Sequence, residues 1–309
     1  MALRTILLHD QTNVNKNENG DYPLTLAIQH NAGAAVGLLV FYGAKDTEGN
    51  AKKLLRSSIQ LGSFAAIQAT SNINATDSDY GRTALHWATW RGPRPGLELL
   101  QKRNAKDNRR DNDGMTALHI ACAGGHDSTI QLLVEKFAAD KNTTTNDGKT
   151  PLHLACAGGH DSTIQLLVEE FAADKNATTN DGKTPLHLAC AGGHDSSIHL
   201  LVEKYAADKE AITNDGTTPL HLACAGGHDS TIQLLVERFA ADKNTVTRDG
   251  TTPLHLACAG GHGSTIKLLI ENFGADVKAR SETGQTALHL LLKKLYVSQV
   301  LDSHQTTHR

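Results

Sequence analysis

Apolar and polar residues follow one pattern that returns every 34 residues through the central part of the chain. In residues 146–179 a short apolar run, Pro151–Ala157, is followed by a Gly-Gly pair and by a second run in which Ile164, Leu167 and Val168 recur at helical spacing. Residues 112–145 repeat this block with five differences. Apolar residues three and four apart share one face of a helix, so this copy predicts two short helices, over 152–157 and 163–169.

The polar residues between these runs supply the expected turn and caps. Gly148, in an Asp-Gly pair, favours a tight turn with positive φ. Thr150 is placed to cap the first helix, and Pro151 falls at the first helical position, where its missing N–H costs nothing. Asp161 and Ser162 are placed to cap the second helix. One such block is too thin to bury its apolar faces alone, so the copies are predicted to stack as an all-α solenoid.

The tetrapeptide Thr-(Pro/Ala)-Leu-His, which follows each turn, resembles the signature of the ankyrin repeat. Its threonines recur at Thr116, Thr150, Thr184, Thr218, Thr252 and Thr286. The resemblance implies an ankyrin-repeat solenoid of about eight to nine stacked units, each with two antiparallel helices and a β-turn finger. It also implies that the chain is not an enzyme and acts as a scaffold or adaptor that binds a partner protein on its concave surface.

The quality of the copies predicts three segments. Residues 1–79 resemble the repeat only weakly and are expected to form an N-terminal cap with degenerate repeats. Regular repeats are expected at 80–111, 112–145, 146–179, 180–213, 214–247 and 248–281. Residues 282–309 are expected to form a C-terminal capping repeat and a tail that is disordered from Asp302 onward. Terminal copies are expected to be atypical because one of their faces meets water.

Two features depart from the ankyrin pattern. The period is 34 residues instead of 33, and the extra residue is assigned to the aromatic at Phe171 and its equivalents. The glycine that ends the second helix in the family is kept at Gly274, but alanine replaces it at Ala138, Ala172, Ala206 and Ala240. Either these alanines adopt a left-handed conformation, which costs about 1–2 kcal/mol each, or the extra aromatic lets the helix end differently.

Composition narrows the classes of partner. The net charge of −3 gives the whole chain no electrostatic footprint for nucleic acid or an anionic membrane. No apolar run approaches the roughly 18–20 residues that span a bilayer, and the N-terminus does not read as a signal peptide. A cytoplasmic monomer is therefore expected. The near-identical repeats also suit a protein that an intracellular bacterium delivers into a host cell, as an effector acting on host proteins.

Several polar groups imitate catalytic or ligand-binding motifs. The His-Asp-Ser run at His160–Ser162 cannot form a triad, because consecutive residues entering a helix point in different directions. A zinc site would need four converging ligands, whereas the ankyrin resemblance gives His153 a hydrogen bond to neighbouring turn backbone and packs Cys156 between repeats. The Gly148–Thr150 segment lacks the upstream glycine of a phosphate-binding loop. No catalytic residue, metal or cofactor is predicted.

The cysteines and the N-terminal residues also give no indication of a catalytic site. Five cysteines recur every 34 residues, which marks one structural position copied five times and not a disulfide framework. A catalytic role for residues 1–79, which include His9 and His30, is disfavoured because they show no nucleophile–base spacing and no Gly-rich loop. They are also too short for an independent active domain.

The best candidates for partner contact lie where the repeat pattern is broken. Trp87 is expected in the core, but Trp90 and Arg91 align with family positions on the exposed concave side of the first helix. Residues 91–110 contain seven basic and two acidic residues, a local charge of +5. Trp and Arg dominate interface hot spots. The predicted contact residues are Trp90, Arg91, Arg94, Arg109 and Arg110, with Lys149, Lys183 and Arg248 at the fingertips.

A modification is the remaining alternative. Ankyrin arrays resemble the substrates of asparaginyl hydroxylases at the Asn that follows Ala-Asp-x. This pattern matches Asn142, Asn176 and Asn244, whereas Glu210 and Lys278 depart from it. The resemblance therefore implies up to three modification sites.

Overall fold

The computed structural model describes residues 27, 73–74, 76–77, 79–90, 95–105 and 108–306. The described elements are all helical, and no strand occurs among these residues. The chain divides into two compact units, Met1–Asn146 and Asp147–Arg309. Most of the weak copies predicted within 1–79 lie outside the described residues, as do Arg91 and Arg94.

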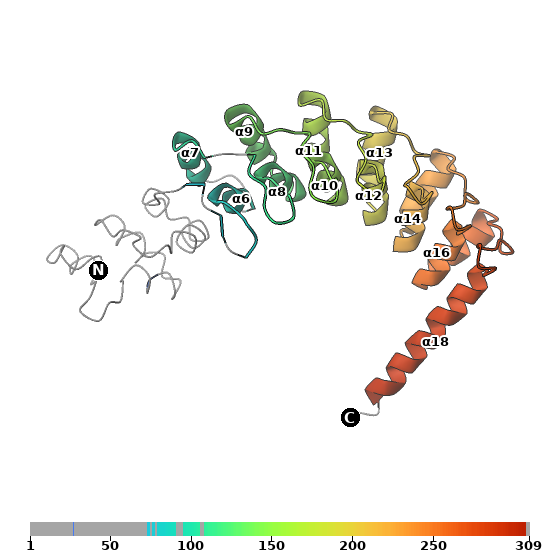
Figure 1. The fold of residues 1–309 in the computed structure, drawn as a ribbon. Helices are drawn as coiled ribbons and strands as arrows, with labels where there is room; N and C mark the ends of the chain where they lie inside the picture. Colours follow the sequence, from blue (N-terminus) through green and yellow to red (C-terminus); the bar gives the residue numbers. More distant parts are fainter. Residues whose placement is uncertain are drawn as a thin grey trace. The chain divides into compact units, whose positions relative to one another are not determined.

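Each described repeat before α18 contributes one inner and one outer helical segment (Figure 1). In the first unit these are α6 (Ala84–Trp90), α7 (Pro95–Lys102), α8 (Ala117–Ala123) and α9 (Asp127–Phe137). In the second unit the inner helices are α10 (Pro151–Ala157), α12 (Pro185–Gly192), α14 (Pro219–Gly226) and α16 (Pro253–Gly260), which pack side by side in that order. The repeated helix-turn-helix units are those of an ankyrin solenoid.

The outer segments of the second unit change helix type part-way along. Each begins as an α-helix and continues as a π-helix: α11 (Asp161–Gln165) with η1 (Leu166–Glu170), α13 (Asp195–His199) with η2 (Leu200–Lys204), α15 (Asp229–Gln233) with η3 (Leu234–Arg238), and α17 (Gly263–Lys267) with η4 (Leu268–Asn272). The last helix, α18, spans Ala287–Thr306. The expected disorder from Asp302 onward is therefore wrong for residues 302–306, which continue this helix.

The start of each inner helix is fixed by a threonine and a histidine that cap each other. In α12, His187 N–H donates to Thr184 Oγ1, while Thr184 N–H donates to His187 Nδ1 at 3.1 Å. Because Nδ1 accepts, Nε2 carries the proton and donates to the Thr217 carbonyl of the next finger at 3.1 Å. The same bonds recur in α10, α14 and α16, so each capping histidine also joins two repeats. The predicted threonine cap is confirmed.

The outer segments begin differently from the prediction. His160 is the N-cap residue of α11 and makes no side-chain capping bond. Asp161 instead accepts a hydrogen bond from Ser197 of the next repeat at 2.5 Å. Thr231 and Thr265 make the same contact, to Asp195 and Asp229. Capping by Asp161 and Ser162 was therefore wrong, because the carboxylate is used between repeats.

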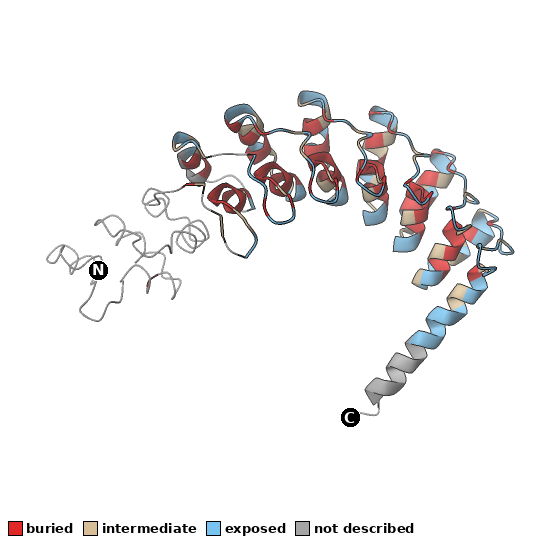
Figure 2. Cartoon of the chain, viewed as in Figure 1, coloured by how far each residue is buried: buried red, intermediate tan, exposed pale blue. Residues whose placement is uncertain are grey.

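The core consists of thin apolar layers between neighbouring repeats (Figure 2). Ile164, Leu167 and Cys156 are fully buried, and so are their counterparts in repeats 180–213 and 214–247. All five cysteines are buried and free. Burial raises the pKa of the thiols, so at neutral pH they act as small apolar side chains.

One buried polar atom in the described part of the chain has no hydrogen bond, the hydroxyl of Thr129. Thr129 holds the position of Thr231, but the aligned residue of the preceding repeat is Arg94 where later copies carry aspartate. We therefore expect Thr129→Val to change the free energy of unfolding by less than about 0.5 kcal/mol. Thr231→Val should cost about 1–3 kcal/mol, because it leaves the Asp195 carboxylate without its partner.

Urea unfolding of the two variants measures this contrast directly. Valine has the shape of threonine, so both substitutions keep the packing and remove only the hydroxyl. Equal losses of stability in the two variants would contradict the assignment of the Thr231–Asp195 bond as an inter-repeat contact.

Candidate partner-binding surface

Aromatic side chains cluster on and just before α6, the inner helix of the first described repeat. Trp87 is buried, and its indole N–H donates to Asp77 Oδ2 at 2.8 Å. Trp90, three residues later on α6, is 59% exposed, and its ring centroid lies 5.6 Å from that of Trp87. The predicted burial of Trp87 and exposure of Trp90 are both confirmed. Large aromatic side chains held in this way lose little conformational entropy when a partner covers them.

The cluster is held in place by Arg82. Its guanidinium carbon lies 5.1 Å from the ring centroid of Tyr80 and 5.3 Å from that of Trp87. Its Nε donates to the buried carboxylate of Asp111 at 3.0 Å. Tyr80 is 46% exposed, so Tyr80 and Trp90 present aromatic surface to solvent from an ordered base. Sequence analysis did not single out Tyr80 or Arg82, although the Asp-Tyr-Gly-Arg turn that contains them departs from the Asn-Asp-Gly of later copies.

Of the predicted arginines in residues 91–110, the structure describes Arg109 and Arg110. Arg109 and Arg110 are exposed in the finger that follows α7, and Arg110 donates to Asn146 Oδ1 at 3.4 Å. No hydrogen bond, ion pair or ring contact joins either arginine to Trp90 within the described residues. These two arginines are therefore not shown in contact with Trp90, and Arg91 and Arg94 lie outside the described residues.

The fingertip cations lie on separate repeats of the second unit. Lys149 and Lys183 each form an ion pair with the aspartate of their own turn, at 2.7 Å to Asp147 and 2.9 Å to Asp181. Partial burial acts to raise the pKa of Asp181, but hydrogen bonds from Lys183 and Thr179 lower it to about 2. Arg248 is exposed at a finger that has threonine in place of the lysine. Two of these three fingertips thus carry a lysine–aspartate ion pair, and the third carries an exposed arginine.

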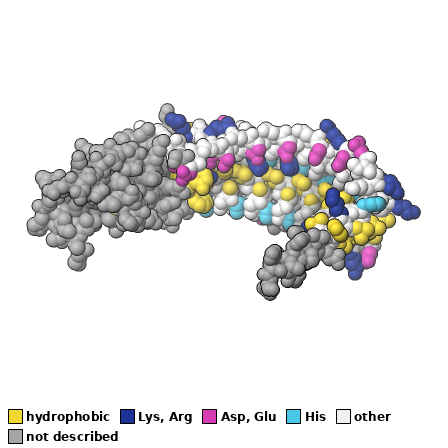
Figure 3. Space-filling view, turned by 60° about the horizontal axis from the view of Figure 1, so that its bottom comes forward, with side chains coloured by type: hydrophobic (Ala, Val, Ile, Leu, Met, Phe, Trp, Pro, Cys, Tyr) yellow, Lys and Arg dark blue, Asp and Glu magenta, His cyan; other side chains and the backbone are white. Residues whose placement is uncertain are grey.

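Side chains of one kind gather in rows on the face formed by the fingers and inner helices (Figure 3). A strip of hydrophobic side chains runs between mixed acidic and basic side chains on one side and histidines on the other. His194, His228 and His262 of the second unit each donate from Nε2 at 2.9 Å to the carbonyl of an alanine near the end of the preceding inner helix. They are structural donors between repeats.

The recurring histidines and cysteines are residue types that bind metal ions in other proteins. Within the described ranges, no group of three or more His, Cys, Asp or Glu side chains is arranged to hold a metal ion. His153 and His187 use both ring nitrogens in hydrogen bonds, Nδ1 to the threonine of their own repeat and Nε2 to a carbonyl of the next. Among the same residues, no helix has the length and apolar content needed to cross a membrane.

Comparison with known families agrees with this geometry. The family model described as "Ankyrin repeats (3 copies)" matches the chain three times, over residues 96–179, 171–247 and 238–301. These matches together cover more than half of the sequence. The chain belongs to the ankyrin-repeat family.

Relatives of this ankyrin-repeat protein match it over part of their length. A putative ankyrin repeat protein of Acanthamoeba polyphaga mimivirus is 30% identical over 42% of this chain and 18% of its own. One of Rickettsia bellii is 38% identical over 25% of this chain and 41% of its own. The human Notch-regulated ankyrin repeat-containing protein is 39% identical over 21% of this chain and 56% of its own. The chain thus spans from about a fifth to just over half of these relatives.

Ankyrin repeats imply protein–protein interaction, and the family is generally a non-catalytic binding fold. The repeats of this ankyrin protein are not all equivalent as binding surfaces. Ala157, Ala191, Ala225 and Ala259 are exposed small residues at the ends of their inner helices. Trp90 is the aligned residue of α6, so this one repeat carries a large aromatic where the copies of the second unit carry a methyl group.

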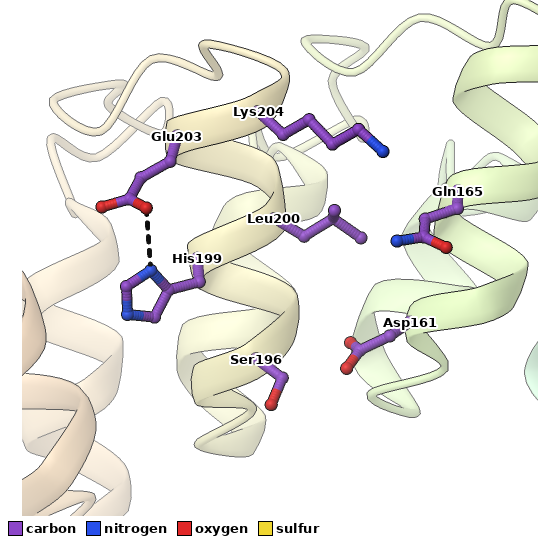
Figure 4. Close-up of a pocket in the computed structure, with 7 residues that line it drawn as sticks. All are labelled: Asp161, Gln165, Ser196, His199, Leu200, Glu203 and Lys204. Atoms are coloured by element: carbon purple, nitrogen blue, oxygen red, sulfur yellow. Dashed lines mark ion pairs between the residues drawn. The ribbon is translucent and has the colours of Figure 1, made fainter.

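Sequence analysis missed a polar groove on the outer face of the second unit (Figure 4). It encloses about 450 Å³ between α11 and the α13–η2 segment, and Asp161 and Gln165 face Leu200 and Lys204 across it. His199 Nδ1 lies 3.3 Å from Glu203, which pairs with Arg238 at 2.6 Å. The available signal was the departure of this repeat from its neighbours, because His199 stands where other copies carry Gln or Lys.

The two walls of the groove are joined to each other. Glu169 pairs with Lys204 at 2.5 Å and accepts the hydroxyl hydrogen of Tyr205. These bonds, from Lys204 first and then from Tyr205, lower the pKa of Glu169. All of these carboxylates already have partners, so the groove is explained by contacts between neighbouring repeats.

Proposed function

We propose that this chain is an adaptor that binds a partner protein on its finger and inner-helix face, with Trp90 as the anchor. The observation that carries the proposal is the exposed Trp90 ring, held against Trp87 at a position where other repeats have alanine. Hot-spot residues are enriched in tryptophan, tyrosine and arginine. Trp90 packs against Trp87, whose ring also contacts Tyr80 and Arg82. Lys149, Lys183, Arg248, Arg109 and Arg110 are proposed as peripheral contacts that affect the rate of association more than affinity.

Affinity capture with matched variants tests the proposal. Proteins captured from lysate by the wild-type chain should be quantified against Trp90→Ala and against Ile212→Ala. Ile212 is 63% exposed on another repeat, so its variant controls for loss of a large exposed apolar side chain. We expect at least a tenfold loss of the main captured protein with Trp90→Ala, which corresponds to a hot spot of about 1.4 kcal/mol or more. Undiminished capture by Trp90→Ala would reject the anchor.

A second candidate function is modification at the asparagine positions. Asn142, Asn176 and Asn244 are exposed, and each backbone N–H donates to the carboxylate of the aspartate two residues earlier. The same turn presents all three asparagine side chains to solvent, which favours action of one asparaginyl hydroxylase on all of them. Peptide mass spectrometry should show the gain of one oxygen at these asparagines and none on the peptides with Glu210 or Lys278.

Delivery into a host cell, as an effector acting on host proteins, remains a prediction. The relatives from Rickettsia bellii and the mimivirus support it only by their source, because they are named as putative ankyrin repeat proteins.

A further inference from the structure

Asp-Gly turns recur at five fingers of the described chain, and one of them differs from the rest. The pairs are Asp113-Gly114, Asp147-Gly148, Asp181-Gly182, Asp215-Gly216 and Asp249-Gly250. The glycine of every pair has a positive φ, between 76° and 86°. The turns therefore share one backbone shape, and differences in their chemistry come from the side chains around each aspartate.

An Asp-Gly pair is the dipeptide in which an aspartate most readily reacts with its own backbone. The glycine nitrogen attacks Cγ of the preceding carboxyl group, because glycine has no Cβ to hinder the approach. The nitrogen loses its proton and the protonated carboxyl loses its hydroxyl, and the two leave as water when the five-membered succinimide ring closes. Water then opens the ring, and opening at the α-carbonyl gives isoaspartate. In this product the chain continues through the β-carboxyl group and the α-carboxylate is free.

Most of these carboxylates are held by neighbouring side chains. In three turns the threonine two residues before the aspartate donates from Oγ1 to its carboxylate: Thr179 to Asp181, Thr213 to Asp215 and Thr247 to Asp249. In two turns a lysine pairs with the aspartate, at Lys149 and Lys183. The threonine bonds lower the pKa of Asp215 and Asp249. Ring closure needs the protonated carboxyl group, so contacts that favour the ionised form oppose it.

The turn at Asp113, which leads from α7 to α8 (Figure 1), lacks these contacts. Asp111 stands where the other four turns carry threonine, and Met115 stands where two of them carry lysine. Asp111 cannot donate a hydrogen bond in their place, because it accepts the N–H groups of Asp113 and Met115 and pairs with Arg82. Asp113 is exposed, and its carboxylate has no hydrogen bond or ion pair within the described residues. No such contact holds this carboxylate away from the nitrogen of Gly114.

The attacking nitrogen does not distinguish the turns. Gly114 N–H donates to the Asp111 carbonyl at 2.9 Å. The glycine N–H makes the same bond at 2.9–3.0 Å in three other turns, at Gly182, Gly216 and Gly250. This bond slows the attack in all four turns to a similar extent, so the carboxylates decide the difference in rate.

We propose that Asp113 is a site of isoaspartate formation in the folded protein. The product has one more methylene in the backbone of a turn that is bonded to the fingers on both sides. Asn112 N–H donates to the Tyr80 carbonyl at 2.8 Å, and the Asp113 carbonyl accepts the Asn146 N–H at 2.9 Å. Isoaspartate displaces these groups and alters the finger face, and its α-carboxylate is a substrate for an S-adenosylmethionine-dependent isoaspartyl methyltransferase. The proposal does not depend on the role of Trp90.

Ageing of the full chain at pH 7 and physiological temperature tests the proposal. Peptide mapping by mass spectrometry, with isoaspartyl peptides as standards, gives the rate at each Asp-Gly pair. It also separates these pairs from Asn19-Gly20, which lies outside the described residues and can form isoaspartate by loss of ammonia. We expect Asp113 to react at least about tenfold faster than Asp181, Asp215 or Asp249, because those sites must first break a hydrogen bond to a charged group. Equal rates in the folded protein would overturn the proposal.

Matched variants and an unfolded control establish whether the fold selects this site. Met115→Lys gives Asp113 the lysine of neighbouring turns and should slow its reaction several-fold. Thr179→Asp combined with Lys183→Met gives the Asp181 turn the sequence of the Asp113 turn and should raise its rate toward that of Asp113. In concentrated urea all five pairs should react at similar rates, because the contacts around the carboxylates are lost. An unchanged rate at Asp113 in Met115→Lys, or the same excess at Asp113 in urea, would also contradict the proposal.

Discussion

Lowering the pH from 7 to 5 is expected to destabilise the second unit by about 2 kcal/mol through His187 alone. Burial lowers the pKa of His187 to about 4, although its hydrogen bond to the Thr217 carbonyl acts in the opposite direction. The unfolded ring titrates near 6.5. The stability that comes from keeping this ring neutral is therefore fully present above pH of about 6.5 and is lost as pH falls from there toward 4.

The geometry explains why the folded protein resists protonation. A protonated ring carries hydrogen on both nitrogens, so His187 Nδ1 would point an N–H at the Thr184 N–H that it now accepts. Burial also lowers the pKa of His86, His153 and His221. These rings act in the same direction, so the total loss at pH 5 should exceed that of one residue.

Urea unfolding followed by circular dichroism at pH 7, 6 and 5 measures this effect. His187→Gln should be less stable than wild type at pH 7, because it loses the buried cap. Its loss between pH 7 and 5 should nevertheless be smaller than that of wild type by about 2 kcal/mol. His199→Gln removes a partly exposed histidine and restores the residue found in other repeats, so it serves as the control. Equal pH dependence of wild type and His187→Gln would show that this ring is not the acid-sensitive group.

The turn aspartates Asp181 and Asp215 act in a lower pH range than the buried histidines. Hydrogen bonds to Thr213, followed by those to other turn groups, lower the pKa of Asp215, and the Asp181 carboxyl has a pKa of about 2. Their stabilising contribution is present above pH of about 4 and is lost below it. In the interval from pH 7 to 5 these turn aspartates therefore stay ionised and do not contribute to the change in stability.

The inner helices could be predicted from sequence because their signals are local. Thr150 and Pro151 define the first turn of α10, and the glycines after Ala157 end it, so the observed bounds differ from the predicted ones by one residue. The burial of Ile164 and Leu167 followed from helical spacing in the same way. These residues choose one conformation without information from neighbouring repeats.

The outer segments were predicted less well because their conformation depends on the extra residue and on neighbours. Periodicity predicted a plain α-helix over 163–169, but η1 begins at Leu166 and has a wider turn. Leu166 is also buried, which the α-helical pattern did not predict, whereas the aligned Leu200, Leu234 and Leu268 are partly exposed. The role of Asp161 was missed because its partner, Ser197, lies 36 residues away.

The same reasoning applies to the candidate surface. The exposure of Trp90 could be predicted because the residue breaks a repeat whose other members are known from the sequence itself. Arg82 could not be assigned to the cluster, because its contacts with Tyr80, Trp87 and Asp111 depend on how two turns meet in space. The exposure of Leu288 on α18 also needed the structure, since the exposure of a helix face depends on whether another element packs against it.

Replacing the four left-handed alanines by glycine is expected to stabilise the protein by about 2–4 kcal/mol in total. Ala138, Ala172, Ala206 and Ala240 have φ values of 56°, 51°, 51° and 53°. Both open alternatives from the sequence hold here: the alanines are left-handed, and the helix end is also wider than usual. The Ala173 N–H donates to the Leu167 carbonyl six residues earlier, one residue further than in a Schellman motif.

The wider turn at the end of each outer segment accommodates the extra residue of the repeat. It does not remove the conformational energy that the Cβ atom adds in the left-handed region. A left-handed alanine costs about 1–2 kcal/mol relative to its usual conformation. The greater freedom of glycine in the unfolded chain offsets up to about 1 kcal/mol of the stability gained by removing this cost. All four methyl groups are exposed, so their removal forfeits little apolar burial. The equivalent Gly274 has φ of 62° and forms the same turn, which shows that glycine fits this site.

Thermal and urea unfolding of the fourfold variant should show the gain, and Ala172→Gly alone should show about a quarter of it. Two control variants test whether the gain in stability comes from relief of backbone strain. Gly274→Ala should destabilise by about 1 kcal/mol for backbone reasons alone, because a Cβ there would meet no atom within 4 Å. Ala173→Gly, at the buried neighbouring residue whose φ is not positive, should destabilise. If Ala172→Gly lowers stability as Ala173→Gly does, backbone strain at the helix ends is not what limits the stability of this repeat.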